Sequence, residues 1–158
     1  MSALTCRRLP DVSVSRLTGL LEVVHDEGDA VDTAHVAMDL NLEFDELLPA
    51  IEAAELLGFA KIKSGKITLT AQGKKMIAGD LASRRRVFKR QLSRVKIFKE
   101  LLALLRKKKR VKKRALIKYC WQKLPRAESE KMVARLIDWG RHAEAIGFDS
   151  EKEELYKL

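Results

Sequence analysis

The stretch "GFAKIKSGKITL" (residues 58–69) decides the fold, because the hydrophobic period changes from helical to alternating within it. Ile62 and Ile67 alternate with polar residues around the pair Ser64-Gly65. This pattern predicts two short strands joined by a tight hairpin turn. Three segments with helical periodicity precede it, and the order helix, helix, helix, hairpin is typical of a winged helix.

The three upstream helices are predicted within residues 12–29, near residues 32–40 and over residues 45–57. A further helical pattern follows the hairpin and is interrupted at Gly79. Beyond it we predict one long helix from residue 81 to residue 107, because apolar residues recur at helical spacing throughout. Its apolar stripe comprises Phe88, Leu92, Val95, Phe98, Leu102 and Leu105, and the same stripe would suit a homodimer.

The second half of the chain echoes the first. The stretches "ELLPAIEAAELLGF" (46–59) and "RLIDWGRHAEAIGF" (135–148) align at an offset of 89 residues, and each ends in Gly-Phe. Helices near residues 95–107, 111–121 and 127–143 would precede a second hairpin. The pattern predicts a repeat of the first unit. The alternative is an unrelated all-α second half.

The predicted fold is therefore mainly α with two small β-hairpins, as tandem winged-helix units joined by a long helix. The chain of 158 residues, 46% of them hydrophobic, suffices for one domain or two small ones. We predict a flexible N-terminus (1–11), a first winged-helix unit (12–80), the connecting helix (81–107) and a second unit (95–158) that shares this helix.

Four stretches carry a family resemblance: "PDVSVSRLTGLLEVV" (10–24), "LLPAIEAAELLGFAKI" (47–62), "ITLTAQGKKM" (67–76) and "LIDWGRHAEAIGFD" (136–149). They resemble the AAA-associated C-terminal domain of ATP-binding subunits of nitrate, sulfonate and taurine type ABC transporters. The resemblance spans the chain from about residue 9 to its end, and the LIDWGRHAE stretch is its most specific part.

This resemblance implies a non-catalytic accessory module, regulatory in role, whose partner is an ABC transporter ATPase or another protein. It carries over no catalytic or ligand residues. Two features depart from the family. No ATPase precedes Met1, which implies either a free-standing version or a fragment, and the run "RKKKRVKKR" (106–114) is more basic than the linker usual in the family.

Charge is distributed unevenly along the chain. The net charge is +10, yet residues 1–83 are acidic overall, and residues 84–114 hold 16 of the 32 Lys and Arg residues with a single acid, Glu100. Clusters of this kind bind phosphate groups or other anions. The candidate anion- or nucleic-acid-binding residues are Arg84, Arg85, Arg86, Lys89, Arg90, Arg106, Lys107, Lys108, Lys109, Arg110, Lys112, Lys113 and Arg114.

Four roles fit this basic segment: sequence-independent contact with nucleic acid, an anionic membrane surface, an acidic protein partner, or a solvated helix end. Readout of DNA bases by the first unit is disfavoured, because its third helix (45–57) contains four acidic residues and no Lys or Arg. Such a helix repels phosphate. The alternative function to the accessory module is therefore a free-standing winged-helix protein that binds nucleic acid through residues 84–114.

Catalytic motifs are absent from the sequence. It contains no phosphate-binding loop G-x-x-x-x-G-K-[ST] and no dinucleotide fingerprint, so we predict neither enzymatic activity nor a cofactor. His25, His35 and His142 show no acidic or cysteine partner at ligand spacing, and we predict no metal site. Cys6 and Cys120 are interpreted as reduced thiols, and Trp139 as a core residue.

No run of about 18 apolar residues spans a bilayer, and the N-terminus lacks the apolar region of a secretory signal. With the cysteines interpreted as thiols, these features predict a cytoplasmic protein.

Overall fold

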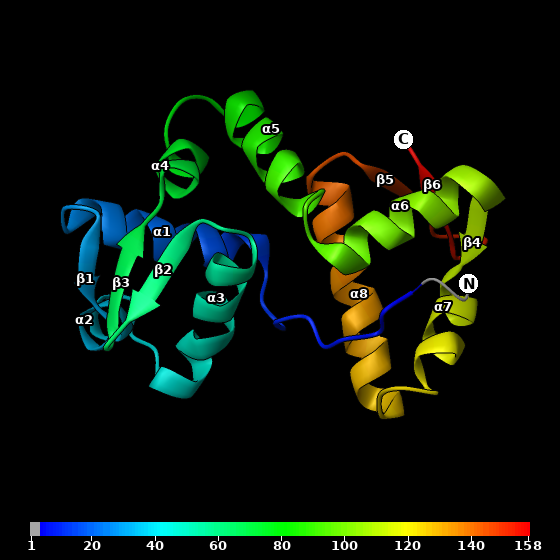
Figure 1. The fold of residues 1–158 in the computed structure, drawn as a ribbon, viewed down its shortest axis with the longest axis horizontal. Helices are drawn as coiled ribbons and strands as arrows, with labels where there is room; N and C mark the ends of the chain where they lie inside the picture. The colour runs from blue at the N-terminus through cyan, green and yellow to red at the C-terminus, as the bar shows by residue number, and fades with distance from the viewer. Residues whose placement is uncertain (1–3) are drawn as a thin grey trace. The chain divides into compact units, whose positions relative to one another are not determined.

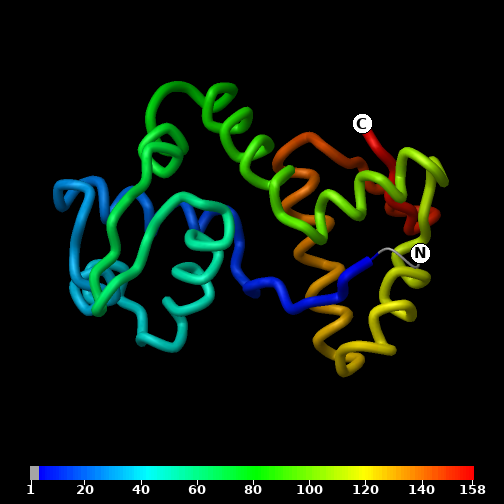
Figure 2. Tube along the Cα trace, in the orientation of Figure 1, coloured from blue at the N-terminus to red at the C-terminus, as the bar shows by residue number. Residues whose placement is uncertain are grey.

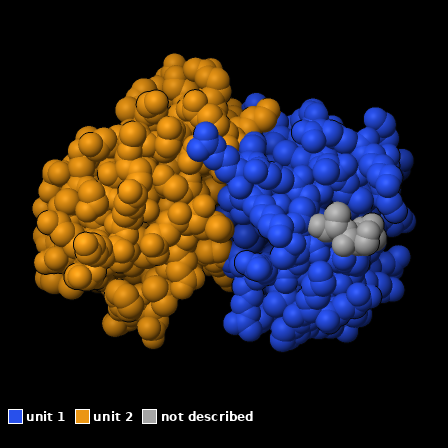
Figure 3. Space-filling view, viewed as in Figure 1, with its two compact units in different colours: residues 1–9, 92–158 blue, residues 10–91 orange. Residues whose placement is uncertain are grey.

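The computed structural model describes residues 4–158. It is mainly helical and contains two small antiparallel sheets of three strands each (Figure 1), so the mainly α prediction is confirmed at this level. The chain divides into two compact units, coloured separately in Figure 3. Unit 2 comprises Pro10–Gln91, and unit 1 comprises Leu92–Leu158 with the N-terminal segment through Leu9.

Unit 2 contains the predicted helices and hairpin together with one additional strand. Its elements are α1 (Val14–Asp26), β1 (Ala30–Asp32), α2 (Thr33–Asp39), α3 (Phe44–Leu56), β2 (Ala60–Lys63), β3 (Lys66–Leu69), α4 (Ala71–Ile77) and α5 (Leu81–Leu92), whose last residue falls in unit 1. The strand order is β1-β3-β2, with Val31 opposite Ile67 and Ile62 opposite Ile67 on the other side.

Unit 1 repeats the same order of elements. It contains α6 (Lys96–Lys108), β4 (Arg110–Lys112), α7 (Lys113–Cys120), α8 (Arg126–His142), β5 (Ile146–Asp149) and β6 (Glu154–Lys157), with strand order β4-β6-β5. Equivalent backbone hydrogen bonds hold the two edge strands: Thr33 donates to the Gly65 carbonyl and Lys113 to the Glu153 carbonyl, both at 2.9 Å. The second half is therefore a repeat of the first.

The register of the repeat differs from the predicted offset of 89. The C-cap of α3 is Leu57 and that of α8 is Ala143, which are 86 residues apart. As a result, Gly58 corresponds to Glu144, and both adopt positive φ, at 75° and 54°. The predicted partner of Gly58, Gly147, lies inside β5 instead. A shift of three residues is close to one helical turn, so the apolar faces of α3 and α8 still match under the wrong alignment.

The predicted long helix is interrupted. The helix α5 ends at Leu92 and α6 begins at Lys96, and Val95 between them is extended, at φ −72° and ψ 126°. The stripe from Phe88 to Leu105 keeps its helical spacing across this break, so periodicity alone predicts a continuous helix. Its six members are at most 9% exposed, and they are therefore not available as the exposed seam of a homodimer.

The N-terminal segment differs from the flexible tail expected for residues 1–11, of which residues 1–3 lie outside the described part. Leu4 and Cys6 are buried, and Thr5 donates its hydroxyl to Glu100 of α6 at 2.7 Å. Cys6 forms a disulfide with Cys120 of α7, so the prediction of two reduced thiols is wrong. Figure 2 shows this segment, in dark blue, crossing α8 and ending near α7, to which the disulfide joins it. Sequence spacing gave no sign of this contact, because 114 residues separate the two cysteines.

Each unit has its own apolar core. In unit 2, Leu17, Leu20 and Leu21 of α1 are fully buried together with Leu47 of α3. In unit 1, Trp139 of α8 is 1% exposed, which confirms its interpretation as a core residue. Gly140 beside it lets α8 approach its neighbours, because a Cβ there would lie 2.6 Å from Ile146 and 3.1 Å from Phe98. Within residues 4–158, no helix is both long and apolar enough to cross a membrane.

Candidate interaction surfaces

The basic segment is divided between the two units. Arg84, Arg85, Arg86, Lys89 and Arg90 lie on α5 in unit 2. In unit 1, Arg106, Lys107 and Lys108 end α6, Lys109 forms the turn, Arg110 and Lys112 lie in β4, and Lys113 and Arg114 begin α7. The basic segment therefore forms two sets of cations, one in each unit.

In unit 2, one of the candidate cations, Arg84, stabilises the folded unit by bonding to other residues in it. Arg84 donates to the carbonyl of Ile77 at 2.6 Å and lies 3.5 Å from Glu22. Arg86 and Arg90 are exposed. They line a shallow, open hollow of about 350 Å³ together with Lys75 of α4, and Ala78 and Val87 supply apolar lining. Lys75 was missed by the sequence analysis because it precedes the basic segment.

In unit 1, Arg110 is held within the sheet. Its guanidinium lies 3.7 Å from both Asp149 and Glu154 and stacks over the Tyr156 ring at 4.9 Å. By contrast, Arg106, Lys107, Lys108 and Lys109 are exposed and form no ion pair with any described residue. They lie at the C-terminal end of α6, where positive charge stabilises the helix dipole. Arg110 therefore supports the sheet, and the four preceding cations remain open to an anion.

The exposed face of α3 combines apolar and acidic side chains. Phe44 is 50% exposed, Leu48 38% and Leu56 43%. With Glu52 they follow one another at spacings of four residues, so they form one stripe along the helix. Asp45 and Glu55 flank it and are also exposed. Met38, near the end of α2, is 79% exposed. The spacing of apolar residues did not reveal this stripe, because α3 contains more apolar residues than its core face can bury.

Two arginines of α8 are paired with acidic side chains of the same helix. Arg126 lies 3.2 Å from Glu130 and 4.7 Å above the Trp121 ring. Arg135 lies 3.2 Å from Asp138. Acidic side chains therefore compensate two of the cations of α8, while Lys131 and Arg141 are exposed.

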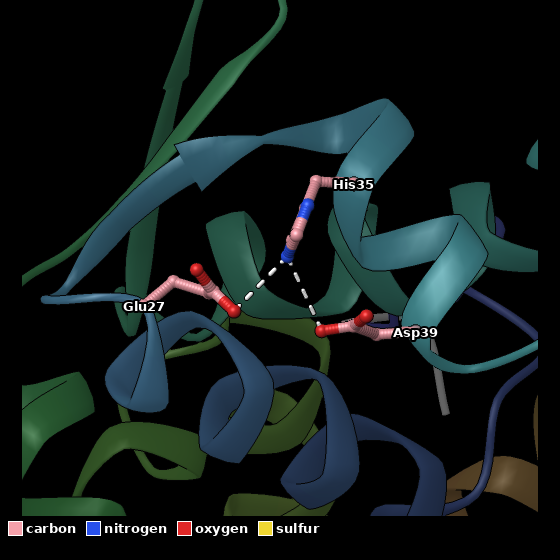
Figure 4. A group of neighbouring side chains, drawn as sticks. All are labelled: Glu27, His35 and Asp39. Carbon is pink, nitrogen blue, oxygen red and sulfur yellow. Dashed lines mark ion pairs between the residues drawn. The ribbon is translucent and has the colours of Figure 1, made fainter.

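His25 and His35 have acidic partners that sequence spacing did not reveal. The Nδ1 atom of His25 lies 2.7 Å from Asp29, and the Nε2 atom of His35 lies 3.0 Å from Glu27 and 3.3 Å from Asp39 (Figure 4). The hydrogen bond to Glu27, followed by the charge of Glu27, raises the pKa of His35 above 6.5. His25–Asp29 and His35–Asp39 are both i,i+4 pairs, and this helical spacing is the signal that was available in the sequence.

Comparison with known families identifies the chain. The family model of the C-terminal AAA-associated domain matches residues 34–149, which is well over half of the chain. The chain belongs to this family. The match confirms the resemblance drawn from the sequence and indicates an accessory domain associated with ATPases. No curated protein and no solved structure matches the chain.

Proposed function

We propose that this C-terminal AAA-associated domain is a non-catalytic module that docks on the ATPase subunit of an ABC-type transporter and regulates it. The observation that carries the proposal is the exposed stripe of α3, formed by Phe44, Leu48, Glu52 and Leu56. Such a stripe suits a protein partner, because apolar anchors at the centre and charges at the rim are typical of protein interfaces.

The charge of α3 argues against a nucleic-acid role for this helix. We interpret each unit as a winged helix with an added edge strand, in which α3 and α8 occupy the third-helix position. A recognition helix in the major groove contacts bases between two rows of phosphates. The acidic side chains of α3 (Asp45, Glu46, Glu52 and Glu55) would be repelled there. Those same charges favour a partner surface with Lys or Arg around an apolar pocket.

A photo-cross-linking amino acid at Leu48 tests the proposal in cells that produce the chain. We expect an adduct with a protein that contains the phosphate-binding loop G-x-x-x-x-G-K-[ST] of an ATPase. Leu81 is the matched control, because it is an exposed leucine on α5 of the same unit. The proposal is wrong if the Leu48 adduct contains no ATPase, or if cross-linking from Leu81 captures the same ATPase equally well.

The alternative function is sequence-independent binding of nucleic acid. The observation that favours it is a pair of exposed cation sets: Lys107–Lys109 in unit 1, which form no ion pair with any described residue, and Lys75, Arg86 and Arg90, which line the hollow in unit 2. Duplex DNA binding at about 50 and about 200 mM salt tests it, since binding through phosphate contacts falls steeply with salt. The variant should replace Lys107, Lys108 and Lys109 with Ala and leave Arg110 in place, because Arg110 supports the sheet. Salt-sensitive binding that this variant loses would favour the alternative.

A further inference from the structure

Three side chains of types that bind metal ions lie close together in unit 2. They come from the end of α1 and from α2, which β1 connects. Glu27 follows the last residue of α1, and His35 and Asp39 lie one turn apart on α2 (Figure 4). The ligand atoms of all three lie within 4.8 Å of one another. Their side chains are 40–45% exposed, so an ion can reach them from solvent without any opening of the fold.

Two of the distances between these atoms fit a common ion. Nε2 of His35 lies 3.0 Å from Oε1 of Glu27 and 3.3 Å from Oδ2 of Asp39. If each atom bonded one ion at about 2.1 Å, as imidazole and carboxylate ligands of zinc do, these separations would correspond to ligand–metal–ligand angles of about 90° and about 105°. Both angles lie within the range from octahedral to tetrahedral geometry. The carboxylate oxygens of Glu27 and Asp39 lie within 4.8 Å of each other, and rotation of these exposed side chains would bring them to the separation that a common ion requires.

The backbone around the three residues is fixed. The Glu27 amide donates to the carbonyls of Val23 and Val24 at 3.2 Å. The link to α2 runs through β1, which pairs with β3, and Thr33 donates to the Gly65 carbonyl at 2.9 Å. The ligands are therefore held near one another before any ion binds, which lowers the entropic cost of binding.

The donor set favours zinc over calcium and magnesium. One imidazole nitrogen and two carboxylate oxygens suit zinc, whereas calcium and magnesium prefer shells made only of oxygen. The carboxylates of Glu27 and Asp39 also place negative charge beside Nε2, which favours a cation there. We propose that Glu27, His35 and Asp39 bind one Zn²⁺ ion, with water completing its coordination. The ion would tie the end of α1 to α2.

Zinc binding to the tag-free chain, measured by competition with a chromogenic zinc chelator, tests this proposal. We expect one ion per chain and a rise in the thermal unfolding midpoint with Zn²⁺, because a ligand that binds only the folded state stabilises it. His35→Gln and Asp39→Asn should each weaken binding by at least about tenfold and remove the thermal shift. Both side chains are exposed, so the variants should fold.

His25→Gln is the matched control. His25 lies in the same unit and bonds Asp29, but it is not one of the three proposed ligands, so this variant should keep wild-type zinc affinity. Failure of Zn²⁺ to bind the wild type would overturn the proposal. So would wild-type affinity in His35→Gln, or a loss in His25→Gln as large as that in His35→Gln.

Discussion

The packing of α4 requires glycine at position 73, because no side chain fits there. A Cβ at this position would lie 2.0 Å from the carbonyl oxygen of Phe59, far inside van der Waals contact. Thr70 holds the same corner, because its hydroxyl accepts from the Gly73 amide at 3.1 Å and donates to the Gly58 carbonyl at 2.6 Å. The start of α4 is therefore packed directly against the backbone before β2.

We predict that Gly73→Ala lowers the free energy of unfolding by about 2 kcal/mol or more, because the added methyl group must displace backbone. Gly19→Ala in α1 is the control. Its Cβ would meet no atom within 4 Å, and removing a glycine from a helix interior should raise stability by about 0.5–1 kcal/mol. Urea unfolding of both variants measures the difference. Equal effects of the two substitutions would contradict the packing described for α4.

Asp149 makes the stability of unit 1 depend on pH. Its Oδ1 accepts the backbone N–H groups of Lys152 and Glu151, at 3.1 and 3.0 Å, and these bonds, that of Lys152 first, lower the pKa of the carboxyl below 3.8. A carboxyl whose pKa is lower in the folded state contributes stability above its unfolded pKa and loses it as pH falls through the folded value.

We therefore predict that the urea midpoint of the wild type falls between about pH 5 and about pH 3 more steeply than that of Asp149→Asn. Asparagine keeps a carbonyl that can accept both bonds but has no proton to take up, so the comparison isolates the titration. Identical pH slopes for the two proteins would show that Asp149 has the same pKa folded and unfolded.

At the scale of elements, periodicity predicted the hairpin and most helices but missed the edge strands. β1 and β4 contain three residues each, too few to show alternation. Each follows a non-glycine residue with positive φ, Asp29 at 71° and Lys109 at 66°, and a lysine gives no signal of that conformation. The break between α5 and α6 was missed for a related reason, since the apolar spacing continues across it.

The N-terminal segment gives a prediction at the same scale. The disulfide between Cys6 and Cys120 joins residues 114 positions apart, and a cross-link over such a distance restricts the unfolded chain strongly. We predict that reduction lowers the free energy of unfolding by about 2–4 kcal/mol, measured by urea unfolding with and without a thiol reductant. The double variant Cys6→Ser, Cys120→Ser should have the same free energy of unfolding as the reduced wild type, and the reductant should not change it. An unchanged midpoint on reduction would contradict a stabilising role for this bond.

At the scale of the whole molecule, the sequence predicted the family and the internal repeat, but it did not predict which residues form the exposed surfaces. The basic segment stands out as one run in the sequence, yet it is divided between two units, and Arg84 and Arg110 support the fold. The stripe of α3 shows the opposite case. Leu48 and Leu47 are adjacent leucines of one apolar helical pattern, and only the exposure of Leu48 in the folded unit, 38%, separates it from buried Leu47. The spacing of apolar residues shows which of them face the core only when the elements that pack against the helix are known.

We propose that the α3 stripe, rather than the basic segment, binds an ATPase. The most direct measurement is the affinity of the ATPase captured at Leu48 for three purified chains: the wild type, Leu48→Glu, and the variant with Lys107, Lys108 and Lys109 changed to Ala. We predict that Leu48→Glu weakens binding by at least about tenfold, while the lysine variant binds within a few-fold of wild type. Loss of binding in the lysine variant with wild-type affinity in Leu48→Glu would contradict the claim.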